Sequence, residues 1–144
     1  MIKRVKMLDQ GRIEEKLDDL VRYHGELVED LPSKSEFVDG RLVRRGIEKT
    51  IELIADTIID IALLIISGKG LEKPEDSRDA IALLEKVKIL PKDVAARIMD
   101  LISFRNLLVH RYTKIDENLE FSTIKEEHPD IISFVKEIEK FLTK

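Results

Sequence analysis

Cysteine and tryptophan are absent from this 144-residue sequence, and no apolar run is long enough to cross a bilayer. Without cysteine there are no disulfides and no thiolate metal sites, so we expect a reducing, cytoplasmic setting. The most apolar run, Ile58 to Ser67, is interrupted by Asp60 and is shorter than the roughly 20 residues of a membrane helix. The N-terminus shows no signal-peptide pattern. We therefore expect a soluble protein with no membrane partner.

Common motifs of nucleotide and hydrolase chemistry are also missing. There is no Gly-rich phosphate loop and no serine nucleophile elbow. His24 and His128 have no carboxylate or second histidine at ligand spacing, so neither indicates a metal site. Asp56 and Asp60 are four residues apart in an apolar stretch, where unpaired carboxylates are costly. They could hold a metal, but capping or contact with an arginine is the favoured interpretation. We expect no metal and no cofactor, with Asp60 facing an active cleft.

Charge limits how the chain could bind nucleic acid. The net charge is −4, so any RNA contact must come from a local basic patch. One cluster holds four basic residues, and a second surrounds the histidine discussed below. The first comprises Arg41, Arg44, Arg45 and Lys49, and the second comprises Arg105, Arg111 and Lys114. The first cluster is also typical of a solvated helix face, and that interpretation stays open.

What is present is a strong helical pattern. With 43% apolar residues, the length fits one domain, residues 1–144, with a substantial core. Apolar residues recur every three to four positions and predict helices over about 9–31, 36–67, 78–88, 91–109 and 129–142. We expect a loop over 113–122, a cap at Ser33 or Ser35 and a second helix buried on several sides. The sequence therefore predicts an all-α, antiparallel helical bundle of about five helices.

The segment Arg105-Asn106-Leu107-Leu108-Val109-His110-Arg111-Tyr112 carries the chemistry, in the pattern R-x4-H-x-Y. An arginine can hold a phosphate through two parallel hydrogen bonds, and a histidine can take or give a proton near neutral pH. Together they could cut RNA without a metal. The histidine would deprotonate a ribose 2′-hydroxyl, and the arginine would stabilise the charge on phosphorus.

Helix geometry limits how these groups can meet. At 100° per residue, Arg105 and Tyr112 lie about 20° apart, whereas Arg105 and His110 lie about 140° apart. Both reach one phosphate only if the helix ends near His110 or a second copy of the chain completes the site, and we favour both together. The alternative is that the arginine forms a salt bridge and the histidine a contact at the helix C-terminus. Tyr112 could likewise simply pack on the bundle.

The stretch from Ser103 to Tyr112 resembles the signature of HepT-like proteins, the HEPN toxin half of a toxin–antitoxin pair. Arg45-Gly46-Ile47-Glu48 and Asp60-Ile61-Ala62 are similar to the family's second helix. Length, helix order and the lack of cysteine fit over most of the chain. A departure lies at Leu63-Leu64, where many relatives carry Asn-His.

The resemblance implies a HEPN-like homodimer whose two R-x4-H-x-Y segments meet in a cleft and act as a metal-independent endoribonuclease. Arg105 and His110 would be the catalytic pair, with Asn106 supporting them. Tyr112 would accept AMP from ATP in a reaction of the cognate antitoxin, a minimal nucleotidyltransferase. A second hypothesis is a non-catalytic helical subunit that docks the nucleotidyltransferase and serves as its AMP acceptor. The intact Arg105, His110 and Tyr112 favour the first, and the acidic net charge leans toward the second.

Overall fold

The computed structural model describes residues 8–110 and 115–144, and these residues form seven helices and no strand. The helices are α1 (Gln10–Asp30), α2 (Lys34–Asp39), α3 (Arg41–Gly68), α4 (Ser77–Lys86), α5 (Lys92–Val109), α6 (Glu117–Glu127) and α7 (Pro129–Leu142). The predicted all-α class is confirmed. Within the described ranges, no helix is long and apolar enough to cross a membrane.

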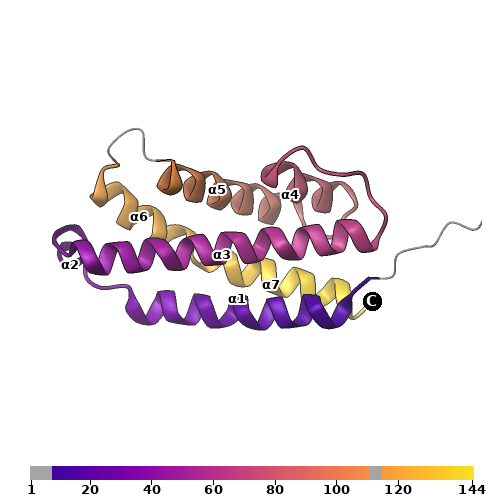
Figure 1. The fold of residues 1–144 in the computed structure, drawn as a ribbon, viewed down its shortest axis with the longest axis horizontal. Coiled ribbons are helices and arrows are strands. Elements are labelled where there is room, and N and C mark those ends of the chain that lie inside the picture. Colours follow the sequence, from indigo (N-terminus) through magenta and orange to yellow (C-terminus); the bar gives the residue numbers. More distant parts are fainter. Residues whose placement is uncertain (1–7, 111–114) are drawn as a thin grey trace, which may run out of the picture.

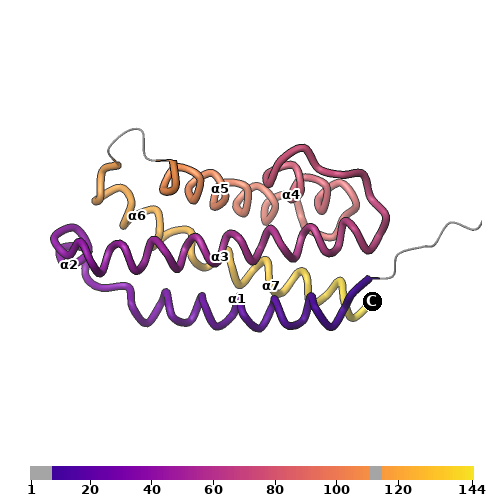
Figure 2. Tube along the Cα trace, viewed as in Figure 1, coloured from indigo at the N-terminus to yellow at the C-terminus, as the bar shows by residue number. Residues whose placement is uncertain are grey.

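Helix α3 forms the centre of the bundle (Figure 1). It packs against α1, α4 and α5, while α7 packs against α1 and α5. Figure 2 shows that the chain runs in opposite directions along α1 and α3, and again along α3 and α5. Nine apolar side chains of α3 are buried. They are Ile47, Ile51, Ile54, Ala55, Ile58, Ile61, Ala62, Ile65 and Ile66. The prediction that this segment is covered on several sides is therefore confirmed.

The predicted long helix over 36–67 is wrong at one point, because the chain turns at Gly40 between α2 and α3. A Cβ atom at Gly40 would lie 2.5 Å from the carbonyl oxygen of Glu36, so only glycine fits this turn without a shift. Ser33 caps α2, as expected, by accepting a hydrogen bond from the Glu36 N–H. The guanidinium of Arg44 then donates to the carbonyl oxygens of Phe37 and Val38, which secures the end of α2 on α3.

The predicted loop over 113–122 is wrong from Glu117 onward, because α6 begins there. Asp116 caps this helix by accepting from the backbone N–H groups of Asn118 and Leu119. Only one narrow side of α6 is buried, and its Phe121 ring packs on Phe37 with the centroids 5.5 Å apart. So few apolar residues give a weak helical pattern in the sequence.

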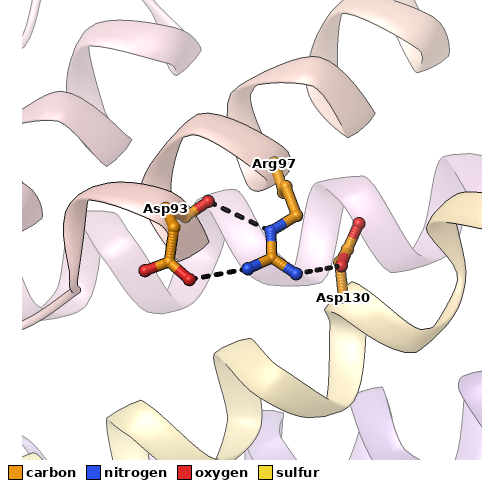
Figure 3. A network of polar contacts seen from close by, with 3 residues as sticks. All are labelled: Asp93, Arg97 and Asp130. Carbon is orange, nitrogen blue, oxygen red and sulfur yellow. Dashed lines mark hydrogen bonds and ion pairs between the residues drawn. The ribbon is translucent and has the colours of Figure 1, made fainter.

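Helices α5 and α7 are joined by the three-residue network shown in Figure 3. The guanidinium of Arg97 contacts Asp93 of α5 at 2.6 Å and Asp130 of α7 at 3.2 Å. Arg97 Nε also donates to the carbonyl oxygen of Asp93. Because Asp130 is 13% exposed and Arg97 is half-exposed, the contact orients α7 on α5 with modest stabilisation.

Candidate active site

Arg105 lies in the last turns of α5 and points toward α3. Its Nη1 atom is 2.9 Å from Oδ1 of Asp56, and the arginine side chain is 17% exposed against 58% for the aspartate. Its Nε atom is buried and has no hydrogen-bond partner among the described residues. The ion pair therefore holds the guanidinium at the boundary between core and solvent.

His110 follows the last residue of α5 and lies outside the helix. Its φ and ψ angles are −98° and 66°, and its backbone N–H donates to the carbonyl oxygen of Asn106 at 2.9 Å. The prediction that the helix ends near His110 is confirmed. Because the backbone leaves the helix here, the 140° separation expected of Arg105 and His110 on a continuous helix no longer applies. His110 and Asn106 are both exposed.

An exposed stripe runs along α3 beside Arg105. Going along the helix it carries Arg45, Lys49, Asp56, Asp60 and Leu63, all of them exposed. Figure 1 shows α3 between α1 and α5, and ion pairs from the stripe reach both neighbours. The basic end of the stripe lies near the start of α3, at the same end of the bundle as His110. This surface, which we call the α3 stripe, is the candidate site.

The carboxylate next to Arg105 is Asp56 rather than the expected Asp60. Oδ2 of Asp60 is 3.2 Å from Nζ of Lys16 on α1, so Asp60 faces the opposite border of the α3 stripe. Its role at an active cleft stays a prediction. Tyr112 and Arg111 lie outside the described residues. In the part of the chain that the structure describes, no three His, Asp or Glu side chains are grouped to hold a metal.

The first basic cluster proves to be heterogeneous. Arg44 is engaged with α2 and lies 3.9 Å from Glu117 of α6, so it acts in folding. Arg41, Arg45 and Lys49 are exposed, and Lys49 lies 3.7 Å from Glu52. The α3 stripe thus carries two exposed positive side chains, Arg45 and Lys49, and Lys49 shares its charge with Glu52.

A histidine pair that the sequence analysis did not predict lies between α1 and the junction of α6 and α7. Nε2 of His24 lies 3.2 Å from Nδ1 of His128, although 104 positions separate them. Burial lowers the pKa of both imidazoles. A positive charge on His128 lowers the pKa of His24 further, and the charge of Lys125 lowers the pKa of His128 further. Beside them, burial and the charges of Asp100, Asp130 and Glu126 raise the pKa of Glu127 to about 7. Residues so distant in sequence carry no local pattern that predicts this contact.

Sequence comparison relates this chain to known proteins. Residues 13–138 match the family described as Ribonuclease HepT-like. A candidate RNase of Archaeoglobus fulgidus is 25% identical over 118 residues, which covers 82% of this chain and 89% of that protein. The tRNA nuclease HepT of Aphanizomenon flos-aquae is 32% identical over 95 residues, covering 66% of this chain and 65% of its own length.

Solved structures share the fold. A Shewanella oneidensis HEPN toxin, described as tri-AMPylated and in complex with an MNT antitoxin, superposes with a TM-score of 0.83 at 20% identity, covering 89% of this chain and 96% of its own. YutE of Bacillus subtilis, a cytosolic protein of unknown function, superposes with a TM-score of 0.81 at 19% identity, covering 95% and 92%. The family match spans most of the described bundle, including α5 and the α3 stripe, and the chain therefore belongs to the HepT-like ribonuclease family.

Proposed function

We propose that this chain is the toxin of a toxin–antitoxin pair and cuts RNA as a metal-independent endoribonuclease, with Arg105 and His110 as catalytic residues. The observation that carries the proposal is the end of α5, where a fixed guanidinium and an imidazole released from the helix lie five residues apart. The family membership supports the same reaction class.

The reaction needs only groups that the chain supplies. His110 would take the proton of a ribose 2′-hydroxyl as the oxygen attacks the adjacent phosphorus. A bond forms between phosphorus and O2′, the bond to O5′ breaks, and the leaving oxygen takes a proton from an imidazolium or from water. Arg105 would stabilise the charge that accumulates on the phosphate oxygens, with Asn106 as a supporting polar group.

A homodimer fits the exposed apolar side chains on α3 and α5. Leu63 on α3 and Leu107 and Val109 on α5 are all more than two-fifths exposed. Large exposed apolar side chains favour coverage by a partner surface. A second copy, related by a two-fold axis, would bring its own Arg105 and His110 to a shared cleft.

Regulation by AMP transfer would act on Tyr112, two residues beyond His110. The phenol oxygen would attack the α-phosphorus of ATP held by a nucleotidyltransferase partner, and pyrophosphate would leave. The product carries a bulky anion, which would compete with RNA for the guanidinium of Arg105. The AMPylated state and MNT antitoxin of the Shewanella toxin support this proposal.

One observation favours the second candidate, a non-catalytic docking subunit. Asp56 neutralises Arg105, and Asp56 and Asp60 place two carboxylates on the α3 stripe, which oppose RNA binding there. This candidate predicts AMP transfer to the chain without any cleavage of RNA.

The deciding experiment incubates the purified chain with total RNA in the presence of a chelator. We expect cleavage by the wild type, loss of cleavage in Arg105→Ala and His110→Ala, and no loss in Arg78→Ala, which removes an exposed arginine of α4. Circular dichroism should show all variants folded. Cleavage that disappears with the chelator and returns with a divalent metal would contradict the metal-independent mechanism and direct attention to Asp56 and Asp60. Intact RNA in every sample would favour the docking subunit.

Coexpression with a nucleotidyltransferase partner tests the regulation separately. Mass spectrometry should find an added adenylate on the peptide that contains Tyr112, and Tyr112→Phe should escape inhibition. Modification of Tyr23 instead would contradict the assignment of Tyr112.

A further inference from the structure

A second concave surface lies at the opposite end of the bundle from His110. It is an open pocket of about 730 Å³, formed by the end of α3, the turn between α4 and α5, the start of α5 and the end of α7. In Figure 1 these four segments meet at the right-hand end of the molecule, whereas α5 reaches its C-terminus at the left. The pocket is therefore separate from the proposed catalytic residues.

Positive charge is concentrated around this pocket. Five lysines and two glutamates line it, a local excess of three positive charges in a chain whose net charge is −4. The lysines are Lys69, Lys88, Lys92, Lys140 and Lys144, and all are exposed. Of the two glutamates, Glu137 lies 3.3 Å from Nζ of Lys140. Because these lysines line one pocket, their summed positive potential attracts an anion.

Lys88 occupies a backbone position that glycine would fill more easily. Its φ angle is +63°, in the left-handed region. The turn closes α4 with two hydrogen bonds, from the Lys88 N–H to the Glu85 carbonyl and from the Ile89 N–H to the Leu84 carbonyl, each 2.9 Å. This is the Schellman motif, in which the left-handed residue is usually glycine. The backbone conformation alone thus disfavours lysine at position 88. A contact made by the lysine's charge would account for its presence there.

The start of α5 adds to the positive potential. Pro91 and Lys92 line the pocket, and Pro91 precedes this 18-residue helix without a capping side-chain hydrogen bond. The N-terminal end of α5 beside the pocket therefore has no side-chain cap. The nearest first-turn carboxylate, Asp93, is engaged by Arg97. The helix dipole therefore reinforces the attraction of the lysines for a phosphate.

We propose that this pocket binds backbone phosphates of RNA at a distance from the cleavage site. The inference rests on the proposed function. Lys92 and Arg105 are separated by 13 positions of α5, or about 20 Å along its axis. The pocket selects RNA that extends well beyond the cut.

The form of the pocket favours an RNA backbone over a free nucleotide. Its lysines are exposed and flexible, and they offer point charges rather than a fixed set of hydrogen-bond donors for one small ligand. Exposed lysines bind phosphates regardless of base sequence. The Phe141 ring, with Lys69 Nζ 5.3 Å from its centroid, adds an aromatic surface of the kind on which unpaired bases stack.

The test measures binding of a long 2′-O-methyl RNA hairpin and of a 2′-O-methyl tetranucleotide by fluorescence anisotropy over a range of salt concentrations. These RNAs lack the attacking hydroxyl, so binding is measured whether or not the chain cleaves RNA. We expect Lys69→Gln with Lys92→Gln to weaken hairpin binding about tenfold and to lower the salt slope by about two, because two phosphate contacts are lost. Binding of the tetranucleotide should not change.

Two further variants separate the pocket from bulk charge and from folding. Lys34→Gln with Lys125→Gln removes the same charge from exposed positions on α2 and α6, and should leave hairpin binding within about twofold of wild type. Lys88→Gly should weaken hairpin binding while the thermal midpoint stays at or above that of the wild type. An equal loss in the control, or unchanged binding in Lys88→Gly and the pocket variant, would overturn the proposal.

The outcomes also distinguish this inference from the proposed function. Hairpin binding that depends on the pocket, in a protein that does not cleave RNA, would support the pocket and refute the nuclease. Cleavage of long RNA with an unchanged KM in the pocket variant would support the nuclease and refute the pocket. Competition by ATP, with hairpin binding unaffected by the lysine changes, would show a free-nucleotide site and overturn the RNA assignment, as would a wild type that binds no hairpin.

Discussion

Replacing Asp56 by alanine tests whether its ion pair with Arg105 holds α5 on α3. The two partners differ in burial, with side chains 17% exposed for Arg105 and 58% for Asp56. Exposed ion pairs contribute about 0.2–1 kcal/mol, whereas removal of one partner from a buried pair costs about 3–5 kcal/mol. Because only one partner is largely buried here, we expect Asp56→Ala to lower the free energy of unfolding by about 1–2 kcal/mol.

A double-mutant cycle isolates the pair. Urea unfolding of the wild type, Asp56→Ala, Arg105→Ala and the double variant should give a coupling free energy of about 1 kcal/mol, which decreases in high salt. The corresponding thermal shift of Asp56→Ala is about 3–8 °C for a chain of this length. Asp60→Ala is the matched control, because its partner Lys16 is itself 30% exposed, and we expect a loss below about 1 kcal/mol. A coupling below about 0.3 kcal/mol, or a larger loss in the control, would refute this reasoning.

Three further predictions concern the bundle and its assembly. Glu127→Gln should stabilise the protein at pH 8 and have little effect near pH 4.5. The pKa of Glu127 is raised to about 7, so its carboxyl favours the folded state at low pH. That contribution to stability is lost as the pH rises through 7. Urea midpoints at both pH values decide this, and an equal shift at both contradicts it. Gly40→Ala should lower the free energy of unfolding by about 1–3 kcal/mol in thermal or urea unfolding, since its Cβ would lie 2.5 Å from a backbone oxygen. Light scattering should give the mass of a dimer at micromolar concentration, and a monomer there would rule out the shared cleft.

The sequence alone determined the class of the fold, and it singled out the segment to which we assign the proposed chemistry. Helical periodicity is local, and it was sufficient to predict α1, α5 and α7 to within about two residues. It also predicted that α5 ends at about Val109, so that His110 lies outside the helix. The prediction of a loop was wrong at α6, because a helix that buries one narrow side shows little periodicity in its sequence.

Tertiary structure decided which side chains meet. Asp56 and Asp60 share one face of α3, about 40° apart, so periodicity cannot say which of them contacts Arg105. The choice follows from how α1 and α5 flank α3, with Lys16 on one border of the α3 stripe and Arg105 on the other. The contact between His24 and His128 also joins residues that are far apart in the sequence. The pocket lined by five lysines likewise combines residues from separate helices. Such contacts depend on helix packing across long sequence separations, which a single sequence does not encode in any local pattern.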